Sequence, residues 1–232
     1  TIQHVALNVD IFSDYTLVTS ALRIQPKCQN KALVLHGVDL ELVELAIDGE
    51  ALKAEDYQVN GEELIITTVP SDNFVFSSVV KIYPHKNFAL EGLYLSKGMY
   101  CTQCEPEGFR KITYYIDRPD VLSLFTTTIT ADKKQYPTLL ANGNLVAQGN
   151  AGEGRHFATW QDPFKKPSYL FAMVAGNLAC LEDSFTTMSG RKVALKIFVE
   201  EQDLRQCAHA MTSLKASMRW DEQKYGREYD LD

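Results

Sequence analysis

The feature that most constrains this fold is a series of short apolar segments that end at turn-forming residue pairs. Residues 5–9 alternate apolar and polar side chains, which is the period of a half-buried strand. Asp48-Gly49 and Asn60-Gly61 are pairs that tight hairpin loops prefer. Because no helical periodicity lies between the segments, residues 1–90 predict an antiparallel β sandwich or a curved sheet. The strands expected there are residues 5–9, 15–24, 42–47, 57–59, 63–69 and 74–83.

The same pattern resumes in the second half of the chain. Asn142-Gly143 predicts a third hairpin within residues 139–148, and the Pro-containing segment 161–167 predicts a turn. In the first half, residues 38–46 also fit a helix, but the turn residues beside them favour a strand. Further strands are expected at residues 109–116, 121–130, 155–160 and 169–175, since these segments are rich in β-branched and aromatic side chains.

The pattern changes near Gly176, where we place a boundary between residues 1–177 and 178–232. Ser189-Gly190 predicts one more hairpin, and Asp203 with Gln206 resembles a capping box at the start of a helix. Gly226 stands where a C-terminal helix cap belongs. Between these signals apolar residues recur at helical spacing, at Met211, Leu214, Met218 and Tyr225.

Composition excludes several classes of protein. A net charge of −7 over 232 residues argues against a nucleic-acid partner, because binding phosphates requires clustered Lys and Arg. No apolar run approaches the roughly 20 residues of a membrane helix, so we expect no membrane partner. An odd number of cysteines favours free thiols and a cytoplasmic location. Because the sequence starts at Thr1, without Met, we expect a piece of a longer chain. The five cysteines are Cys28, Cys101, Cys104, Cys180 and Cys207.

Residues 94–120 concentrate the polar, acidic and sulfur-containing side chains between two apolar runs. Loops supported by strands often carry recognition residues. Cys101-x-x-Cys104 could be half of a zinc site, but a structural zinc needs four ligands and no second pair has suitable spacing. Two ordinary thiols are therefore the favoured interpretation of this pair.

Glu105 and Glu107 stand at the apex of the same stretch, with Gln103 just before them. They could form a general acid/base pair or a cation clamp. Because the chain turns at Pro106 and Gly108, the two carboxylates are not expected to share one site, and solvated turn carboxylates are the favoured interpretation of this pair. No H-E-x-x-H, G-x-S-x-G or phosphate-binding loop is present in the sequence, so no complete catalytic set is recognised.

Several runs in order resemble the aminopeptidase N family of zinc metallopeptidases, its bacterial branch most closely. The resemblance implies a mainly β fold: an N-terminal antiparallel saddle or sandwich domain, then the first hairpin and first helix of a thermolysin-like catalytic domain. The family's G-A-M-E-N and H-E-x-x-H motifs are missing from this sequence. It follows that no catalytic or metal-ligating residue is expected here, and that zinc belongs to the full-length enzyme. The runs are G-M-Y-C-T-Q-C-E-P-E-G-F-R-K-I-T-Y-Y-I-D-R-P-D, Y-P-T-L-L-A-N-G-N, W-Q-D-P-F, Y-L-F-A-M-V-A-G-N and A-M-T-S-L-K-A-S-M-R-W-D-E.

The resemblance also implies a role for two residues. The position matching Glu105 binds the free α-amino group of a peptide substrate, and the position matching Gln103 lines the pocket for the first side chain. Glu107 is expected to face away from that pocket. The implied partners are peptide substrates and the remaining catalytic and C-terminal domains of the same chain. Two alternatives stay open: a non-catalytic β-sandwich interaction module, and a stand-alone zinc-binding domain that uses Cys101 and Cys104.

Overall fold

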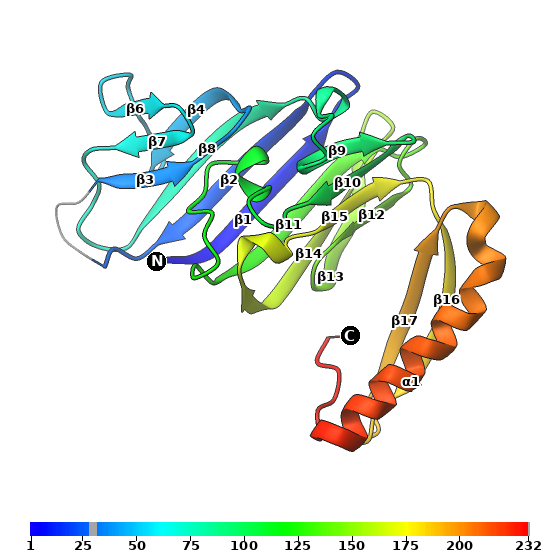
Figure 1. Ribbon diagram of the computed structural model, residues 1–232. Helices are drawn as coiled ribbons and strands as arrows, with labels where there is room; N and C mark the ends of the chain where they lie inside the picture. The colour runs from blue at the N-terminus through cyan, green and yellow to red at the C-terminus, as the bar shows by residue number, and fades with distance from the viewer. Residues whose placement is uncertain (28–31, 232) are drawn as a thin grey trace. The chain divides into compact units, whose positions relative to one another are not determined.

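The computed structural model describes residues 1–27 and 32–231, and Cys28 lies outside these ranges. It divides into two compact units, Thr1–Gly176 and Asn177–Asp232. The first unit is built from strands and short 3₁₀ helices, and the second contains the α-helix of the described residues. The prediction of a mainly β chain with one helix at its C-terminal end is confirmed (Figure 1).

The largest sheet of the first unit has eight strands in the order β13-β14-β11-β1-β2-β8-β4-β5. Neighbouring strands are antiparallel except β1 and β11, which run parallel with Val5 opposite Phe125. Burial alternates along β2, β8 and β11, so one face of this sheet forms the core. The strands are β1 Ile2–Ile11, β2 Thr16–Ile24, β4 Glu41–Ile47, β5 Glu50–Ala51, β8 Phe74–Ile82, β11 Ser123–Asp132, β13 Asn144–Gly152 and β14 Arg155–Lys166.

Two smaller sheets complete the first unit. One has the order β3-β7-β6 and the other β12-β15-β10-β9. Both contribute side chains to the same apolar core as the large sheet, for example Leu35 from β3 and Tyr100 from β10. The described bounds are β3 Leu33–His36, β6 Tyr57–Asn60, β7 Glu63–Ile66, β9 Gly92–Ser96, β10 Met99–Gln103, β12 Thr138–Ala141 and β15 Met173–Gly176, with 3₁₀ helices η1 Pro84–Lys86, η2 Phe109–Lys111 and η3 Ser168–Leu170.

The hairpins predicted at Asp48-Gly49 and Asn60-Gly61 are confirmed as β4–β5 and β6–β7. The hairpin predicted at Asn142-Gly143 is wrong, because β12 pairs with β15 while β13 pairs with β14 in the large sheet. The pair makes a turn between two sheets: a Cβ at Gly143 would lie 2.2 Å from the carbonyl oxygen of Gln161. The turn predicted at residues 161–167 is wrong as well, since β14 continues to Lys166.

The strand predicted at residues 109–116 is also wrong. This segment begins with η2 and continues irregularly, with a single bridge that pairs Tyr115 with His36. The aromatic side chains that suggested a strand are buried: Phe109 packs edge-to-face against Tyr115 at 5.0 Å and against Phe171 at 5.2 Å between ring centroids. The aromatic and β-branched composition therefore indicated that these side chains are buried. An irregular segment can bury such side chains as well as a strand can, provided that its backbone groups are hydrogen-bonded.

In the second unit, β16 (Ala179–Thr186) and β17 (Lys192–Val199) form the predicted hairpin. The 3₁₀ helix η4 (Glu201–Gln206) leads into α1 (Cys207–Tyr225), whose Met211 packs against Phe185 in a small core. Gly226 ends the helix at φ 62°, as predicted. No helix of the described residues is both long and apolar enough to cross a membrane.

The predicted capping box is wrong. The Gln206 and Asp203 side chains bond to each other at 3.3 Å, and α1 begins after a 3₁₀ turn without a side-chain cap. Residues 203 and 206 both lie within that 3₁₀ turn, so they cannot take the two ends of an α-helical capping box.

Candidate functional site

The candidate site is the turn that follows strand β10. The strand ends at Gln103, and residues 105–108 turn back so that the Gly108 amide donates to the Cys104 carbonyl at 2.8 Å. A Cβ built at Gly108 would lie 2.3 Å from the Gln103 carbonyl oxygen, so a side chain at this position would collide with backbone. The close return of the chain places Glu105, Pro106 and Glu107 at an exposed apex.

Gln103 and Glu105 line one open pocket with a volume of about 660 Å³. The Gln103 side-chain amide donates to the Glu105 backbone carbonyl at 3.3 Å, which links the two residues directly. The other lining residues are Pro106, Glu107, Pro119 and Tyr169. The structure therefore brings together both residues that the sequence resemblance singled out.

Glu107 lines the same pocket, so the expectation that it faces away is wrong. That expectation assumed an extended segment, whereas residues 105–108 form a turn. Sequence reasoning also missed Tyr169 and Pro119, which reach the pocket from other segments. Both lie in or beside runs that carry the family resemblance, but nothing in their spacing connects them to Glu105.

The two carboxylates of the pocket differ in their charge partners. Glu107 is paired with the guanidinium of Arg110 at 3.2 Å, and Arg110 in turn contacts the buried Asp117 at 3.3 Å. Among the described residues Glu105 has no ion-pair partner, and its side chain is exposed. Arg110 also pairs with Glu62 at 3.6 Å, so its one positive charge is shared by three carboxylates. A cation entering the pocket would therefore meet an unpaired carboxylate at Glu105 and a partly compensated one at Glu107.

The two cysteines near the turn are not equivalent. Cys101 is partly buried on β10 opposite Tyr94, whereas Cys104 is buried. Burial, with a smaller contribution from the charge of Asp117, raises the pKa of the Cys104 thiol to about 12. A protonated, buried thiol is a poor metal ligand. The described residues contain no group of three or more His, Cys, Asp and Glu side chains that could hold a metal ion.

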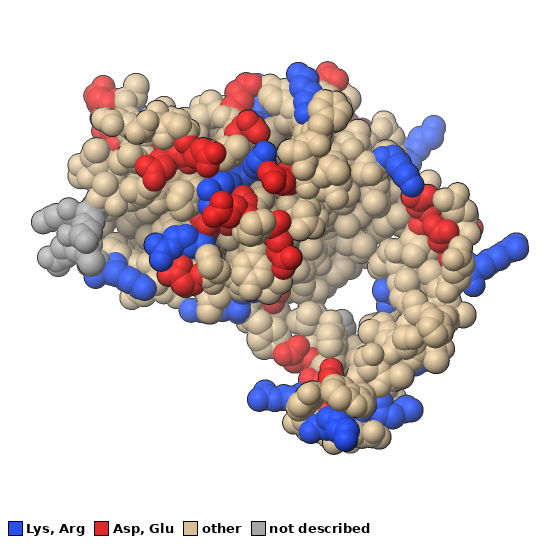
Figure 2. Space-filling model, in the orientation of Figure 1, with Lys and Arg blue, Asp and Glu red and all other residues tan. Residues whose placement is uncertain are grey.

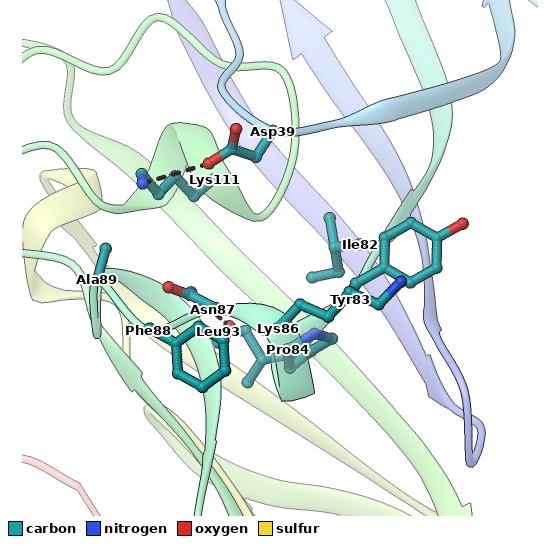
Figure 3. A pocket seen from close by; sticks show the side chains of 10 residues that line it. All are labelled: Asp39, Ile82, Tyr83, Pro84, Lys86, Asn87, Phe88, Ala89, Leu93 and Lys111. Atoms are coloured by element: carbon teal, nitrogen blue, oxygen red, sulfur yellow. Dashed lines mark hydrogen bonds and ion pairs between the residues drawn. The ribbon is translucent and has the colours of Figure 1, made fainter.

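A second hollow, of about 380 Å³, lies beside η1 and is shown in Figure 3. Its Lys111 is paired with Asp39 at 3.4 Å and with Glu91 at 3.3 Å. Its second lysine, Lys86, lies over the Tyr83 ring at 4.8 Å from the ring centroid, so each of the two ammonium groups has a partner within the first unit. Figure 2 shows acidic and basic side chains interspersed on the viewed face of the first unit, without a continuous basic stripe.

Comparison with known proteins defines the class of this chain. Residues 2–170 match the family model described as the Peptidase M1 N-terminal domain, and the chain belongs to this family. Over its whole length it is 52% identical to aminopeptidase N of Caulobacter vibrioides and 49% identical to aminopeptidase N of Escherichia coli K12. It covers 27% and 26% of those two relatives, so it spans about a quarter of their length.

Solved structures agree with this assignment. The crystal structure of Legionella pneumophila aminopeptidase A in complex with aspartic acid matches 99% of this chain with a TM-score of 0.93 at 34% identity. The chain covers 27% of that structure. A Deinococcus radiodurans M1 zinc metallopeptidase matches 86% of the chain with a TM-score of 0.73, and its identity of 15% shows the shared fold alone.

Proposed function

We propose that this chain is the N-terminal, substrate-amine-recognising portion of a zinc aminopeptidase that removes N-terminal amino acids from peptides. The observation that carries the proposal is the shared pocket of Gln103 and Glu105 in a member of this peptidase family. The relatives are aminopeptidases by name, which does not favour a non-catalytic interaction module.

The proposed role of Glu105 follows from its free carboxylate. A peptide's α-ammonium group would bind there through charge-assisted hydrogen bonds, which are roughly twice as strong as neutral ones. Gln103, which shares the pocket, would border the first side chain. Because internal peptide bonds have no adjacent ammonium group, recognition of this group would confine cleavage to the N-terminus. The Legionella relative was solved with aspartic acid, an amino acid that carries such a group.

In this proposal, residues outside the described part of the chain hold the zinc. The described residues contain no group of side chains that could hold a metal ion. The chemistry of the zinc in the full-length enzyme is the activation of a water for attack on the first peptide bond. We assign residues 1–177 to the N-terminal β domain and residues 178–232 to the start of the catalytic domain. The remaining catalytic and C-terminal domains of the same chain are then its partners, and the enzyme is cytoplasmic.

The first experiment compares the chain of residues 1–232 with the full-length protein on an alanyl chromogenic substrate, and measures bound zinc in both. We expect hydrolysis and stoichiometric zinc in the full-length protein, and neither in the shorter chain. Hydrolysis or stoichiometric zinc in the shorter chain would overturn the division of roles. A full-length sequence without G-A-M-E-N and H-E-x-x-H after residue 232 would overturn the proposed activity.

The second experiment replaces Glu105 with Gln in the full-length protein. Loss of a charged hydrogen bond costs about 1.5–3 kcal/mol, so we expect KM to rise roughly 10- to 150-fold. Glu153→Gln is a matched control, because Glu153 is an exposed carboxylate in the turn between β13 and β14. If Glu105→Gln and Glu153→Gln give the same KM as the parent, Glu105 does not bind the substrate amine.

A further inference from the structure

A buried carboxylate lies behind the pocket turn. The Asp117 side chain is 1% exposed. Its Oδ2 accepts from the backbone N–H of Arg110 at 3.1 Å and from Arg110 Nε at 3.3 Å. Its Oδ1 accepts from the Ser168 hydroxyl at 2.5 Å. Both oxygens are therefore used, and each is bound to a different segment of the chain.

Each of these segments adjoins residues that line the pocket, here called its glutamate wall (residues 105–107) and its tyrosine wall (Tyr169). Arg110 belongs to η2, which directly follows the turn of residues 105–108, and its guanidinium also holds Glu107 at 3.2 Å. Ser168 begins η3 and immediately precedes Tyr169, which lines the same pocket. One buried carboxylate thus connects the glutamate wall with the tyrosine wall.

Asp117 is itself fixed by its backbone. Its N–H donates to His36 Nδ1 at 3.1 Å, and its carbonyl accepts from Arg110 Nη2 at 3.1 Å. The first N–H groups of a helix have no partner within the helix, and Gly108 offers η2 no side-chain cap. The Asp117 carboxylate takes this role for the N–H of Arg110. A buried charge is tolerated when it is paired and fully hydrogen-bonded, as it is here.

We propose that Asp117 is a positioning residue for the substrate amine: it fixes the turn that carries Glu105 against the wall that carries Tyr169. Asp117 is buried and does not line the pocket, so it acts through Arg110 and Ser168 and does not touch the substrate. This inference rests on the proposed function, since it assigns a support to the same amine-binding pocket.

The test is Asp117→Asn in the full-length enzyme. Asparagine keeps the shape, and its amide oxygen can still accept from Arg110 while its NH₂ group donates to the Ser168 hydroxyl. What it removes is the negative charge that pairs with the Arg110 guanidinium, so the connection to the turn is weakened. We expect KM for an alanyl substrate to rise about tenfold while kcat stays within about twofold. A purely structural role predicts the opposite split: fewer active molecules, hence a lower apparent kcat, with an unchanged KM.

Competitive inhibition supplies a second readout. Phenylalaninamide carries an α-ammonium group, and 3-phenylpropanamide lacks it. We expect Asp117→Asn to weaken inhibition by the first compound by the same factor as KM, and to leave inhibition by the second unchanged. Equal weakening of both compounds would mean that the substitution distorts the whole pocket, and would overturn a role specific to the amine.

Ser168→Ala keeps the proposal testable if Asp117→Asn does not fold, because it removes a single hydrogen bond to Oδ1. We expect a smaller rise in KM, about two- to threefold. Ser20→Ala is the matched control: Ser20 is also buried, and its hydroxyl contacts Ser78 at 3.3 Å in the large sheet. We expect its KM to match that of the parent.

The outcomes separate the two proposals. If Glu105→Gln leaves KM unchanged, the proposed function fails. If Glu105→Gln raises KM but neither Asp117→Asn nor Ser168→Ala does, this inference alone is overturned. A rise in KM with all three, and none with Ser20→Ala, supports both.

Discussion

Phe109→Ala tests whether the pocket turn is anchored by the aromatic core directly behind it. Phe109 is fully buried and follows the turn of residues 105–108. Its ring packs edge-to-face against three others, with centroid distances of 5.0 Å to Tyr115, 5.8 Å to Phe125 and 5.2 Å to Phe171. Such geometry is favourable for aromatic pairs. The substitution would therefore remove the ring on which this cluster is centred.

The size of the effect follows from how little the site can collapse. Core Phe→Ala substitutions cost about 3–5 kcal/mol, more where the cavity persists. The rings around Phe109 are themselves at most 3% exposed. Tyr115 is further held by the 2.7 Å hydrogen bond between its hydroxyl and Ser123 Oγ, so it cannot tilt into the space freely. We therefore expect a loss of about 4–5 kcal/mol, near the upper end of that range.

The assay is urea unfolding of the 232-residue chain, followed by tryptophan fluorescence in a Trp220→Phe background. The remaining Trp160 is partly buried in the first unit, where its indole N–H donates to the Leu139 carbonyl at 3.1 Å. With m of about 2–3 kcal/mol/M, the midpoint should fall by about 1.3–2.5 M. Phe88→Ala is the control, because Phe88 is 87% exposed and should shift stability by less than about 0.5 kcal/mol. Equal shifts in the two variants, or a loss below about 1 kcal/mol for Phe109→Ala, would refute the anchoring role.

Three further predictions concern the same region. Gly108→Ala should lower the urea midpoint more than Gly149→Ala does. A Cβ at Gly108 would lie 2.3 Å from a backbone oxygen, whereas a Cβ at Gly149 would meet a movable side-chain ring at 3.1 Å. Equal midpoints for the two variants would contradict this prediction. Burial raises the pKa of Tyr100 to about 12, so the unfolded chain loses this proton first and stability should fall as pH rises from about 10 to 12. Titration of the unfolding midpoint should show a smaller fall in Tyr100→Phe, and an unchanged slope would exclude Tyr100 as its source. Iodoacetamide at pH 8 should leave Cys104 unlabelled in the native protein, because burial raises the pKa of its thiol to about 12. In urea the exposed thiol should be labelled, and peptide mass spectrometry distinguishes the two results. Labelling in the native protein would count against the burial of Cys104.

Local signals predicted the elements that local interactions determine. The β4–β5 and β6–β7 hairpins were found because an Asp-Gly or Asn-Gly pair fixes the turn between adjacent strands. The helix ending at Gly226 was found because only its own periodicity and cap were needed. The parallel pairing of β1 with β11 carries no comparable signal, since more than a hundred residues separate Val5 from Phe125.

Failures arose where the partner of a segment, and not its own composition, decides the structure. Asn142-Gly143 has the residues of a hairpin turn, yet the strands on its two sides join different sheets. Residues 109–116 have the composition of a strand, yet they bury their rings without a ladder of hydrogen bonds. Composition indicates that a side chain is buried, but it does not indicate which strand or segment pairs with the backbone of that residue.

The candidate site divides in the same way. Gln103 and Glu105 could be found because they are two residues apart in a recognisable run, but the role of Asp117 could not. Its side-chain partners are 7 and 51 residues away, at Arg110 and Ser168, and its backbone bonds to His36, 81 residues away. A buried aspartate has no distinctive spacing, and only the folded chain shows that it connects the two walls of the pocket.

This arrangement separates binding from support, and the separation has a measurable consequence. In the proposed function Glu105 accepts a substrate ammonium, and a carboxylate with that task cannot also be committed to holding its own loop. Glu105 is exposed and without an ion-pair partner among the described residues. Support then falls to Gly108, Phe109 and Asp117, all of which are buried. We therefore expect Glu105→Gln to change the urea midpoint by less than the equivalent of about 0.5 kcal/mol while it raises KM in the full-length enzyme. A destabilisation of Glu105→Gln comparable to that of Phe109→Ala would show that Glu105 supports the loop, and the proposed division would then be wrong.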